Sequence, residues 1–488
     1  MRKEILILLL MLISIFTAMP ISFSTPMPER YIVVFDDERI PSDAQSLIKK
    51  HGGDVLRTFP DLGILIAEST SANFKNDLAN EQSIKFVALD RWTKFIPCSS
   101  KGMVFSMHDD SASAVGSYYS WEQWSMKILN PAEEYDNSAS SDDPYYDLYQ
   151  WNMKIINATE DKAWTVTTGT HEVKVAILDT GVAYDHPDIA PNYDFELSTY
   201  FIDPEIEIAF LKENPEEAPY IPTVISEDEY DPALDYNGHG TWCAGAVAAA
   251  WNGWGVIGVA PDVTIVNVKV MIAEGWGYWS WLLEGIYYLA HADIDIGSMS
   301  LGGYVDLSQD WGRAIYEAML RATSYAYRHG VLLVAAAGNE GLNLDLIFPW
   351  QFLPAQLPTV VGVSGITHNY TLSPISNYGY SVVEITAPMG YWYGYPEPGW
   401  WLYLPFSTWS PHCWRKPGYY FAWMDGTSAA TPHVAGVAGL ILSLQPDFSP
   451  TLVRVTLGSS ACDLGPTGFD PYFGYGLIDA YSAVTLVA

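Results

Sequence analysis

The stretch that decides the fold is Gly426-Thr427-Ser428-Ala429-Ala430-Thr431-Pro432-His433-Val434-Ala435-Gly436, followed by an apolar run to Leu444. Small residues before an apolar run predict a loop that turns into a buried helix, with Ser428 in its first turn. A helix N-terminus carries partial positive charge and free N–H groups, which favour an oxyanion. A serine there can act as a nucleophile if the chain also supplies a base and an orienting carboxylate.

Two stretches upstream of Ser428 supply these groups. Val175-Ala176-Ile177-Leu178-Asp179-Thr180-Gly181 is an apolar strand that ends in an acid, and Asn237-Gly238-His239-Gly240-Thr241 places a histidine before an alanine-rich helix. A further stretch, Ala335-Ala336-Ala337-Gly338-Asn339, ends in an amide that can donate to an oxyanion. Each residue alone has an ordinary explanation: a network acid, a loop histidine or an N-capping serine. Together, in this order, they predict acyl transfer.

The order Asp, His, Ser and the sequences around these residues resemble the subtilisin-like serine proteases. The resemblance implies a triad in which Ser428 attacks the peptide carbonyl, His239 takes and returns the proton, and Asp179 orients the imidazole. It also implies that Asn339 and the Ser428 backbone N–H form the oxyanion hole.

Two glycine-containing segments resemble the family's substrate-binding strands. They are Gly275-Trp276-Gly277 and Ser300-Leu301-Gly302. Extended peptides add a strand to such edges, and glycines let the backbones approach closely. The alternative for each segment is an ordinary glycine-rich turn. Trp276 lies where a bulky side chain could narrow a subsite.

The composition excludes some functions. The chain has 488 residues, of which 49% are hydrophobic, and a net charge of −33. This acidity argues against nucleic acid as a partner, because phosphates require a basic face. Few Lys and Arg also limit repulsion between positive charges at acid pH, so we expect tolerance of an acidic medium, with salt adaptation as the competing explanation. Four cysteines are too few for a disulfide scaffold, although Cys413 and Cys462 could pair.

Residues 1–24 are typical of a secretory signal peptide. Arg2 and Lys3 precede an apolar run over residues 5–18, and Ser22-Phe23-Ser24 offers small residues for cleavage. An uncleaved membrane anchor is the alternative, but the run is short for a span. We therefore expect a secreted, extracellular protein without a stable membrane span after signal cleavage.

Residues 25–96 and 97–147 precede the predicted catalytic domain. Between residues 31 and 90 the elements follow the ferredoxin-like order β-α-β-β-α-β, with Ser42 placed to cap a helix over 42–51. This unit resembles the subtilisin-type propeptide, which implies a folding aid and intramolecular inhibitor; an unrelated small domain is the alternative. Residues 97–147 are predicted to form a linker or arm.

Residues 148–488 predict an α/β domain with a mostly parallel sheet and helices on both faces. Expected strands lie at 173–178, 264–270, 294–299, 331–336, 359–363 and 382–387, and expected helices at 241–250, 280–291, 310–329 and 428–444. Ligands bind at the carboxyl ends of strands in such sheets. Because Asp179 and Asn339 each follow a strand, both can reach one crevice.

Two long segments interrupt this frame. Residues 195–235 are rich in acids with Lys212 as the single base, and residues 391–424 are crowded with aromatic residues. Acidic runs are more often solvated than ligating, and none here has calcium-ligand spacing, so a structural Ca²⁺ stays open without a named ligand. The aromatic segment forms either a rigid flap or a cleft wall that selects apolar substrate side chains.

The sequence therefore predicts a secreted serine endopeptidase, made as a self-processed zymogen, that cleaves proteins or peptides without a cofactor for its chemistry. We expect self-cleavage between residues 91 and 147. Two alternatives stay open: a catalytically silent binding protein with the same fold, and an esterase. The complete set of four site residues argues against the first, and the lack of Gly-x-Ser-x-Gly around Ser428 argues against the second.

Overall fold

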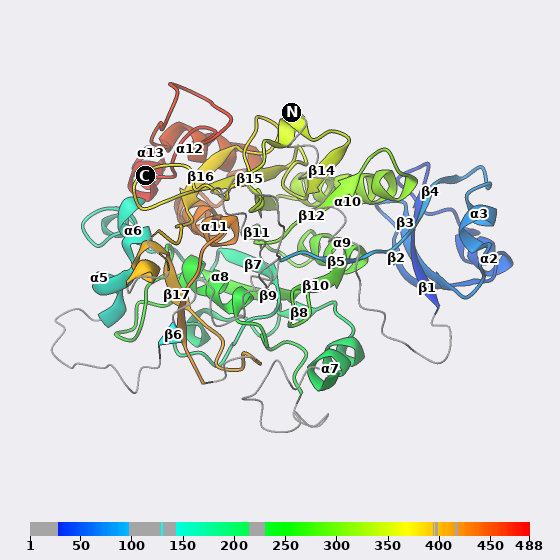
Figure 1. Cartoon of the computed structure of the whole chain (residues 1–488), viewed down its shortest axis with the longest axis horizontal. Helices are drawn as coiled ribbons and strands as arrows, with labels where there is room; N and C mark the ends of the chain where they lie inside the picture. Colours follow the sequence, from blue (N-terminus) through cyan, green and yellow to red (C-terminus); the bar gives the residue numbers. More distant parts are fainter. Residues whose placement is uncertain are drawn as a thin grey trace, which may run out of the picture.

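The computed structural model describes residues 28–96, 128–129, 143–213, 230–393, 395, 399–414 and 418–488. A small N-terminal unit lies at one side of a larger α/β domain (Figure 1). The predicted signal peptide, Cys98 and most of the predicted arm lie outside the described residues.

Seven parallel strands form the central sheet of the larger domain, in the order β16-β15-β13-β11-β7-β9-β8. They are β7 (Lys174–Asp179), β8 (Thr199–Tyr200), β9 (Thr264–Lys269), β11 (Ile296–Met299), β13 (Leu332–Ala336), β15 (Val360–Ile366) and β16 (Ile385–Pro388). Apart from the edge strand β8, almost every residue in them is buried, as in a parallel sheet covered on both faces. The six strands predicted from the sequence are confirmed, with ends shifted by a few residues.

Alternate residues of β7 divide the core into two layers. Val175 and Ile177 join the cluster that contains α8 and α11, whereas Ala176 and Leu178 join the cluster that contains α9 and α10. These helices are α8 (His239–Ala248), α9 (Trp279–Leu289), α10 (Asp310–Arg328) and α11 (Thr427–Leu444). All four predicted helices are thus confirmed, and they cover both faces of the sheet.

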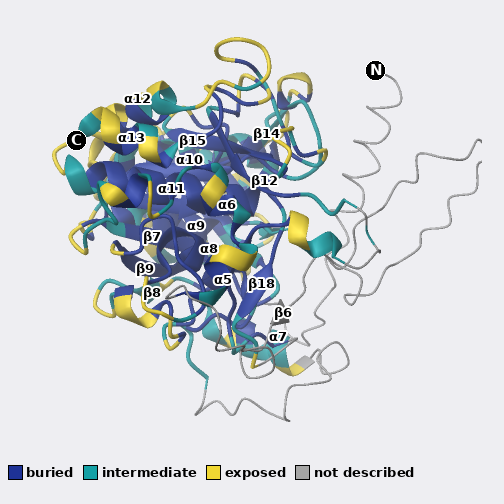
Figure 2. Ribbon diagram, turned by 90° about the vertical axis from the view of Figure 1, so that its left-hand side faces the viewer, coloured by how far each residue is buried: buried dark blue, intermediate teal, exposed yellow. Residues whose placement is uncertain are grey.

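The helix α11 forms the centre of one layer and lies in the buried interior (Figure 2). Among the described helices, it is the one that is long and apolar enough to cross a membrane by length and composition. Its apolar window is 89% buried within the fold, which confirms the interpretation of this run as a core helix.

Shorter elements complete the larger domain. The helices are α5 (Pro144–Tyr149), α6 (Trp151–Ile155), α7 (Pro204–Glu213), α12 (Pro450–Ser460) and α13 (Ala480–Val487), with 3-10 turns at η3 (Ala163–Thr165), η4 (Ala190–Asn192), η5 (Leu344–Leu346) and η6 (Trp400–Tyr403). The strands β12 (Gly303–Asp306) and β14 (Trp350–Leu353) form an antiparallel pair, and β6 (Ile128–Leu129), β18 (Phe421–Trp423) and β17 (Phe406–Thr408) form a small sheet.

The N-terminal unit has the predicted β-α-β-β-α-β order. It consists of β1 (Glu29–Phe35), α2 (Ala44–Lys50), β2 (Gly53–Phe59), β3 (Ile64–Ser69), α3 (Phe74–Leu78) and β4 (Ile84–Leu89), with an antiparallel sheet ordered β2-β3-β1-β4. The predicted Ser42 cap is wrong. Residues before Ala44 form a turn in which Ala44 N–H donates to Pro41 O at 3.1 Å, so Asp43 precedes the helix.

The described part of the aromatic segment packs on the larger domain. Phe406, Phe421 and Trp423 are fully buried in a cluster with Tyr145. These contacts favour the rigid-flap interpretation, because the rings face the protein's own core instead of solvent. No disulfide joins Cys413, which is buried, to Cys462, which is exposed, so that suggested pairing is wrong.

Candidate active site

Asp179 and His239 meet at the edge of the central sheet. Asp179 ends β7 and His239 begins α8; the histidine Nδ1 lies 2.8 Å and 3.0 Å from the two carboxylate oxygens of Asp179. Gly240 permits this approach, because a Cβ there would lie 2.1 Å from the Gly181 carbonyl oxygen. Burial opposes a charge on His239, but the Asp179 carboxylate and the Cys243 sulfur together outweigh burial and raise the pKa of His239 well above its ordinary value.

Ser428 lies in the first turn of α11, after Gly426, whose φ of 109° suits a residue without a side chain. Its Oγ donates to the Ser300 carbonyl oxygen at 3.1 Å, while Ser300 Oγ donates to the Ser428 carbonyl oxygen at 2.9 Å. Ser428 is 7% exposed. The predicted nucleophile and the predicted substrate strand are therefore in direct contact.

Cys243 connects the two predicted catalytic helices. Its Sγ lies 3.9 Å from His239 Nδ1 and 3.8 Å from the Ser428 carbonyl oxygen, so the first turns of α8 and α11 are adjacent. Among the described residues, Asp179, His239 and Cys243 are the three metal-ligating types found within 4.8 Å of one another, but the Asp–His hydrogen bond already uses the facing atoms. Burial raises the pKa of the Cys243 thiol, which supports its interpretation as a small core residue.

Asn339 follows β13 and faces the start of α11. Its Oδ1 accepts hydrogen bonds from Thr427 N–H at 2.8 Å and from Thr427 Oγ1 at 3.0 Å. Because two donors hold the amide oxygen, the orientation of the amide is determined and its NH₂ group is left to donate elsewhere. Thr427 thus fixes the orientation of the Asn339 side chain, whose NH₂ group is the predicted oxyanion donor.

The chain's own residues 92–96 occupy the space between the two predicted substrate strands. The strand β5 (Trp92–Lys94) pairs antiparallel with β10 (Trp276–Tyr278), and Phe95 N–H donates to Gly275 O at 3.0 Å. On the other side, Gly302 N–H donates to Phe95 O at 3.1 Å. Both segments therefore accept an added strand, as the resemblance implies.

The side chains along this groove are mostly aromatic. The Trp276 ring stacks on Trp92, with centroids 6.1 Å apart, and Phe95 packs edge-on against Trp279 at 4.8 Å. Leu301 is buried in the same core cluster as Phe95. The backbones of these segments bind an extended part of the protein's own chain, which supports the prediction that they are substrate strands.

Sequence reasoning missed the support behind His239. The fully buried Asp235 accepts hydrogen bonds from Thr180 Oγ1 (2.9 Å), Gly238 N–H (2.8 Å) and Thr241 N–H (2.9 Å). It thereby ties the end of β7 to the start of α8. The Trp409 ring packs directly against Gly238, because a Cβ on Gly238 would lie only 2.2 Å from the ring. An acid four residues before a histidine that begins a helix is the signal that could have revealed this cap.

The acidic segment also reaches the site, because one of its acids, Glu207, is buried. Glu207 on α7 is fully buried, with Oε2 2.7 Å from Lys269 Nζ and Oε1 accepting from Ala273 N–H at 2.7 Å. The Ala273 carbonyl accepts from Asn237, whose Oδ1 accepts from His239 N–H at 3.1 Å. One chain of hydrogen bonds therefore joins the inserted helix to His239.

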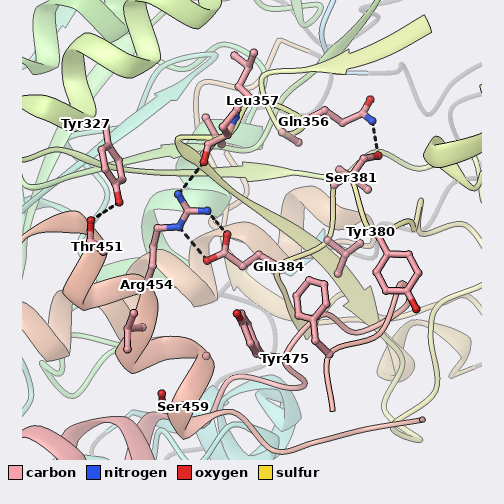
Figure 3. Close-up of a pocket in the computed structure, with 18 residues that line it drawn as sticks. Tyr327, Gln356, Leu357, Tyr380, Ser381, Glu384, Thr451, Arg454, Ser459 and Tyr475 are labelled. Carbon is pink, nitrogen blue, oxygen red and sulfur yellow. Dashed lines mark hydrogen bonds and ion pairs between the residues drawn. The ribbon is translucent and has the colours of Figure 1, made fainter. Parts of the chain in front are cut away.

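A cavity lies elsewhere, in the described part of the larger domain. It has a volume of about 740 Å³ and shares no residue with the site just described. Figure 3 shows Arg454 reaching across it to Glu384, with Nε 3.0 Å from the carboxylate, and Arg454 also donates to Pro358 O at 3.0 Å. Arg454 and Glu384 therefore satisfy each other's charge in this cavity. Residues 92–96 occupy the space between the predicted substrate strands.

Comparisons with known proteins agree with this geometry. Residues 170–476 match the Subtilase family. Thermitase of Thermoactinomyces vulgaris is 32% identical over 328 residues, which cover 66% of this chain and 92% of thermitase. Subtilisin E of Bacillus subtilis (strain 168) is 31% identical over 316 residues, 65% of this chain and 66% of that sequence.

Solved structures share the fold. The epidermin leader peptide processing serine protease of Staphylococcus aureus aligns with a TM-score of 0.70 at 20% identity, over 94% of this chain and 99% of that chain. A lanthipeptide protease aligns with a TM-score of 0.56 at 28% identity, over 70% of this chain and 95% of that chain. The chain belongs to the subtilase family and is a subtilisin-like serine endopeptidase.

Proposed function

We propose that Asp179, His239 and Ser428 form the catalytic triad of this endopeptidase. The observation that carries the proposal is the hydrogen bond from His239 Nδ1 to the buried Asp179 carboxylate at 2.8 Å. This bond leaves Nε2 as the ring nitrogen that takes the Ser428 proton. Ser428 Oγ donates to Ser300 O in this structure, so attack begins with rotation of the hydroxyl toward the neutral His239 ring.

The attack produces a tetrahedral intermediate whose oxygen bears negative charge. Asn339 Nδ2 and the Ser428 backbone N–H donate to this oxygen; the latter belongs to the first turn of α11 and has no partner within the helix. His239 then protonates the leaving amine, and water hydrolyses the acyl-enzyme by the reverse sequence of proton transfers. Asp179 holds the ring and stabilises its charged form throughout.

The N-terminal unit acts as an intramolecular inhibitor. Residues 92–96 lie in the groove as an added strand, and ion pairs hold the unit on the larger domain: Arg57–Glu284 at 3.0 Å and Lys85–Glu317 at 2.7 Å. A protease that holds its own chain in this way is a zymogen until that chain is cut and released. Because residues 92–96 approach Ser428 from the acyl side, self-processing follows Ile96, within the part of the chain outside the described residues.

Secretion rests on the signal-like sequence of residues 1–24. The small-residue region at Ser22-Phe23-Ser24 is the expected signal cleavage point. The inhibitor unit then keeps the protease inactive during export.

A structural calcium site is part of this proposal. Asp143 and Asp188 are both buried; Asp143 Oδ1 accepts from Trp254 N–H at 3.2 Å and Asp188 Oδ2 accepts from Val256 N–H at 3.1 Å. Burial, and then the nearby Asp143 charge, raise the pKa of Asp188. Two buried carboxylates are oxygen donors of the kind that Ca²⁺ prefers, and the ion would tie the start of the domain to this loop. Asp143 and Asp188 are 45 residues apart, so they do not form a recognisable calcium-binding loop in the sequence.

One experiment tests the triad and the processing together. Wild type, Ser428→Ala and the exposed-serine control Ser308→Ala are purified, sequenced from the N-terminus, labelled with a fluorophosphonate and incubated with casein. We expect Ser428→Ala alone to lose labelling, to stay unprocessed and to lose turnover by about 10⁶-fold, the loss that removal of the triad serine causes in subtilisin.

Other outcomes would contradict particular parts of the proposal. Near-normal casein cleavage by Ser428→Ala would end the triad assignment. Wild-type labelling without peptide cleavage, but with ester hydrolysis, would favour the esterase. Absence of labelling and of all hydrolysis would favour a silent binding protein. Processing of purified Ser428→Ala without added protease would refute self-cleavage.

A further inference from the structure

We propose that Phe352 closes the space that would receive the substrate side chain on the acyl side of the scissile bond, so that this enzyme cleaves after small residues such as Gly, Ala and Ser. The inference rests on the proposed triad and extends it to a substrate class. The space in question lies between two segments that flank Ser428. Each segment has a glycine facing this space, Gly302 in one and Gly338 in the other.

The bound segment 92–96 shows where that substrate residue lies. Gly302 N–H donates to Phe95 O, and a Cβ on Gly303 would lie 3.1 Å from Thr93 Cγ2, so the segment runs antiparallel to this strand and advances toward Ser300. The Ser300 carbonyl contacts Ser428 Oγ. A chain that continues in extended form beyond Phe95 therefore reaches Ser428 within two or three residues.

The acyl-side residue then lies between two walls. One wall is the 300–302 segment, and the other is the 338–339 segment that carries the proposed oxyanion donor Asn339. Gly302 and Gly338 have no side chains, which would leave a gap between the walls for a substrate side chain. The contents of this gap decide which side chains fit.

Phe352 fills the gap. A Cβ on Gly302 would lie 2.4 Å from the Phe352 ring, and a Cβ on Gly338 would lie 3.1 Å from the same ring. The ring comes from β14, opposite Tyr304 of β12, with centroids 4.9 Å apart. Phe352 is 6% exposed, so the ring is packed in place.

The polar groups beside the ring are also engaged. Glu340 Oε2 accepts from Tyr304 Oη at 2.8 Å, from Asn377 Nδ2 at 2.6 Å and from Asn339 N–H at 3.1 Å. All three donors bind the same carboxylate oxygen, so they fix the position of Glu340 beside the ring. The closed gap disfavours large apolar side chains.

The chain's own sequence agrees with this selection. After Ile96 it reads Pro97-Cys98-Ser99-Ser100, a run without a large side chain at the place where self-processing is proposed. These residues lie outside the described part of the chain.

The test uses the mature enzyme and tetrapeptide p-nitroanilides that differ only in the residue before the anilide: Ala, Ser, Leu, Phe or Lys. We expect wild type to prefer Ala over Phe by about 100-fold in kcat/KM, the scale of discrimination that a closed apolar pocket provides. Phe352→Gly should reverse this preference, and Phe352→Ala should give an intermediate result. The matched control Phe348→Ala, whose side chain is 76% exposed, should retain the wild-type order.

Fluorophosphonate titration in each sample gives the concentration of active sites, so a folding loss in one variant does not alter kcat/KM per site. Cleavage by wild type after Phe or Leu as fast as after Ala would overturn this inference while leaving the serine endopeptidase intact. An unchanged preference in both Phe352 variants would overturn it too. Absence of fluorophosphonate labelling and of all peptide cleavage would overturn the triad proposal and, with it, this inference.

Discussion

His433 predicts a limit to the acid tolerance that the composition suggests. This histidine is fully buried inside α11. Its Nδ1 donates to Ala429 O at 2.7 Å, so its Nε2 is the atom that accepts from Asn152 Nδ2 at 2.9 Å. A protonated ring would place an N–H against that amide donor and a charge among apolar side chains. Burial lowers the pKa of His433 to about 4.

The size of the effect follows from the two states. In the unfolded chain a histidine titrates near pH 6.5, so between about pH 6.5 and 4 the unfolded chain binds a proton that the folded chain does not. Unfolding is therefore favoured as the pH falls. The free energy of unfolding should drop by about 2 kcal/mol at pH 5, and by about 3 kcal/mol below pH 4. Domains are stable by only about 5–15 kcal/mol, so this loss is measurable.

The assay is urea unfolding, followed by tryptophan fluorescence, of full-length protein in the Ser428→Ala background, which prevents self-digestion. His433→Gln should be less stable than its parent at pH 7, and this difference should shrink by about 2 kcal/mol at pH 5, because only the parent carries the titrating ring. The exposed control His171→Gln should follow its parent at both pH values. A parent-to-His433→Gln difference that stays constant between pH 7 and 5 would refute the reasoning.

Four further predictions follow from the site. Asn339→Ala should lower kcat by about 10²–10³-fold with little change in KM, and a change confined to KM would contradict its oxyanion role. Asp179→Asn should lower kcat by about 10⁴-fold. Activity requires the neutral His239 ring, so it should rise as the pH increases through the raised pKa of His239. Asp179→Asn should move this rise to lower pH. A pH–activity profile that does not move would contradict the pairing of Asp179 with His239. Glu207→Ala should lower the free energy of unfolding in urea by about 3–5 kcal/mol, because it leaves the charge of Lys269 buried without its ion-pair partner. A change near zero would show that the ion pair does not stabilise the fold. Removal of Ca²⁺ with a chelator should lower Tm, with recovery on adding Ca²⁺, and Asp188→Asn should show neither response.

Local sequence was sufficient where one segment carries the whole signal. Residues 175–178 before Asp179 are all apolar and Thr180-Gly181 follows, so the burial of this strand on both faces and its end were predictable. The core helix after Ser428 was predictable for the same reason. The Ser42 cap failed because a turn at Pro41 and Ala44 competes with the cap, a local choice that composition does not decide.

Long-range pairing was beyond the sequence. Glu207 belongs to a run of acids that reads as solvated, yet it is buried because Lys269, far along the chain, provides the opposite charge. Asp143 and Asp188 both bind the backbone of the 252–256 loop, and they lie close enough to influence each other only because the fold brings the start of the domain to this loop. A sequence alone does not show which distant partner compensates a buried charge.

The sequence by itself determined the order of strands and helices, the parallel sheet and the candidate Asp179, His239 and Ser428, because apolar periodicity and short motifs are local properties. Only the tertiary structure decided that residues 92–96 fill the groove and that Phe352 lies between Gly302 and Gly338. Both results depend on the packing of segments distant in sequence, and packing is set by shape and volume across the whole core rather than by any one stretch.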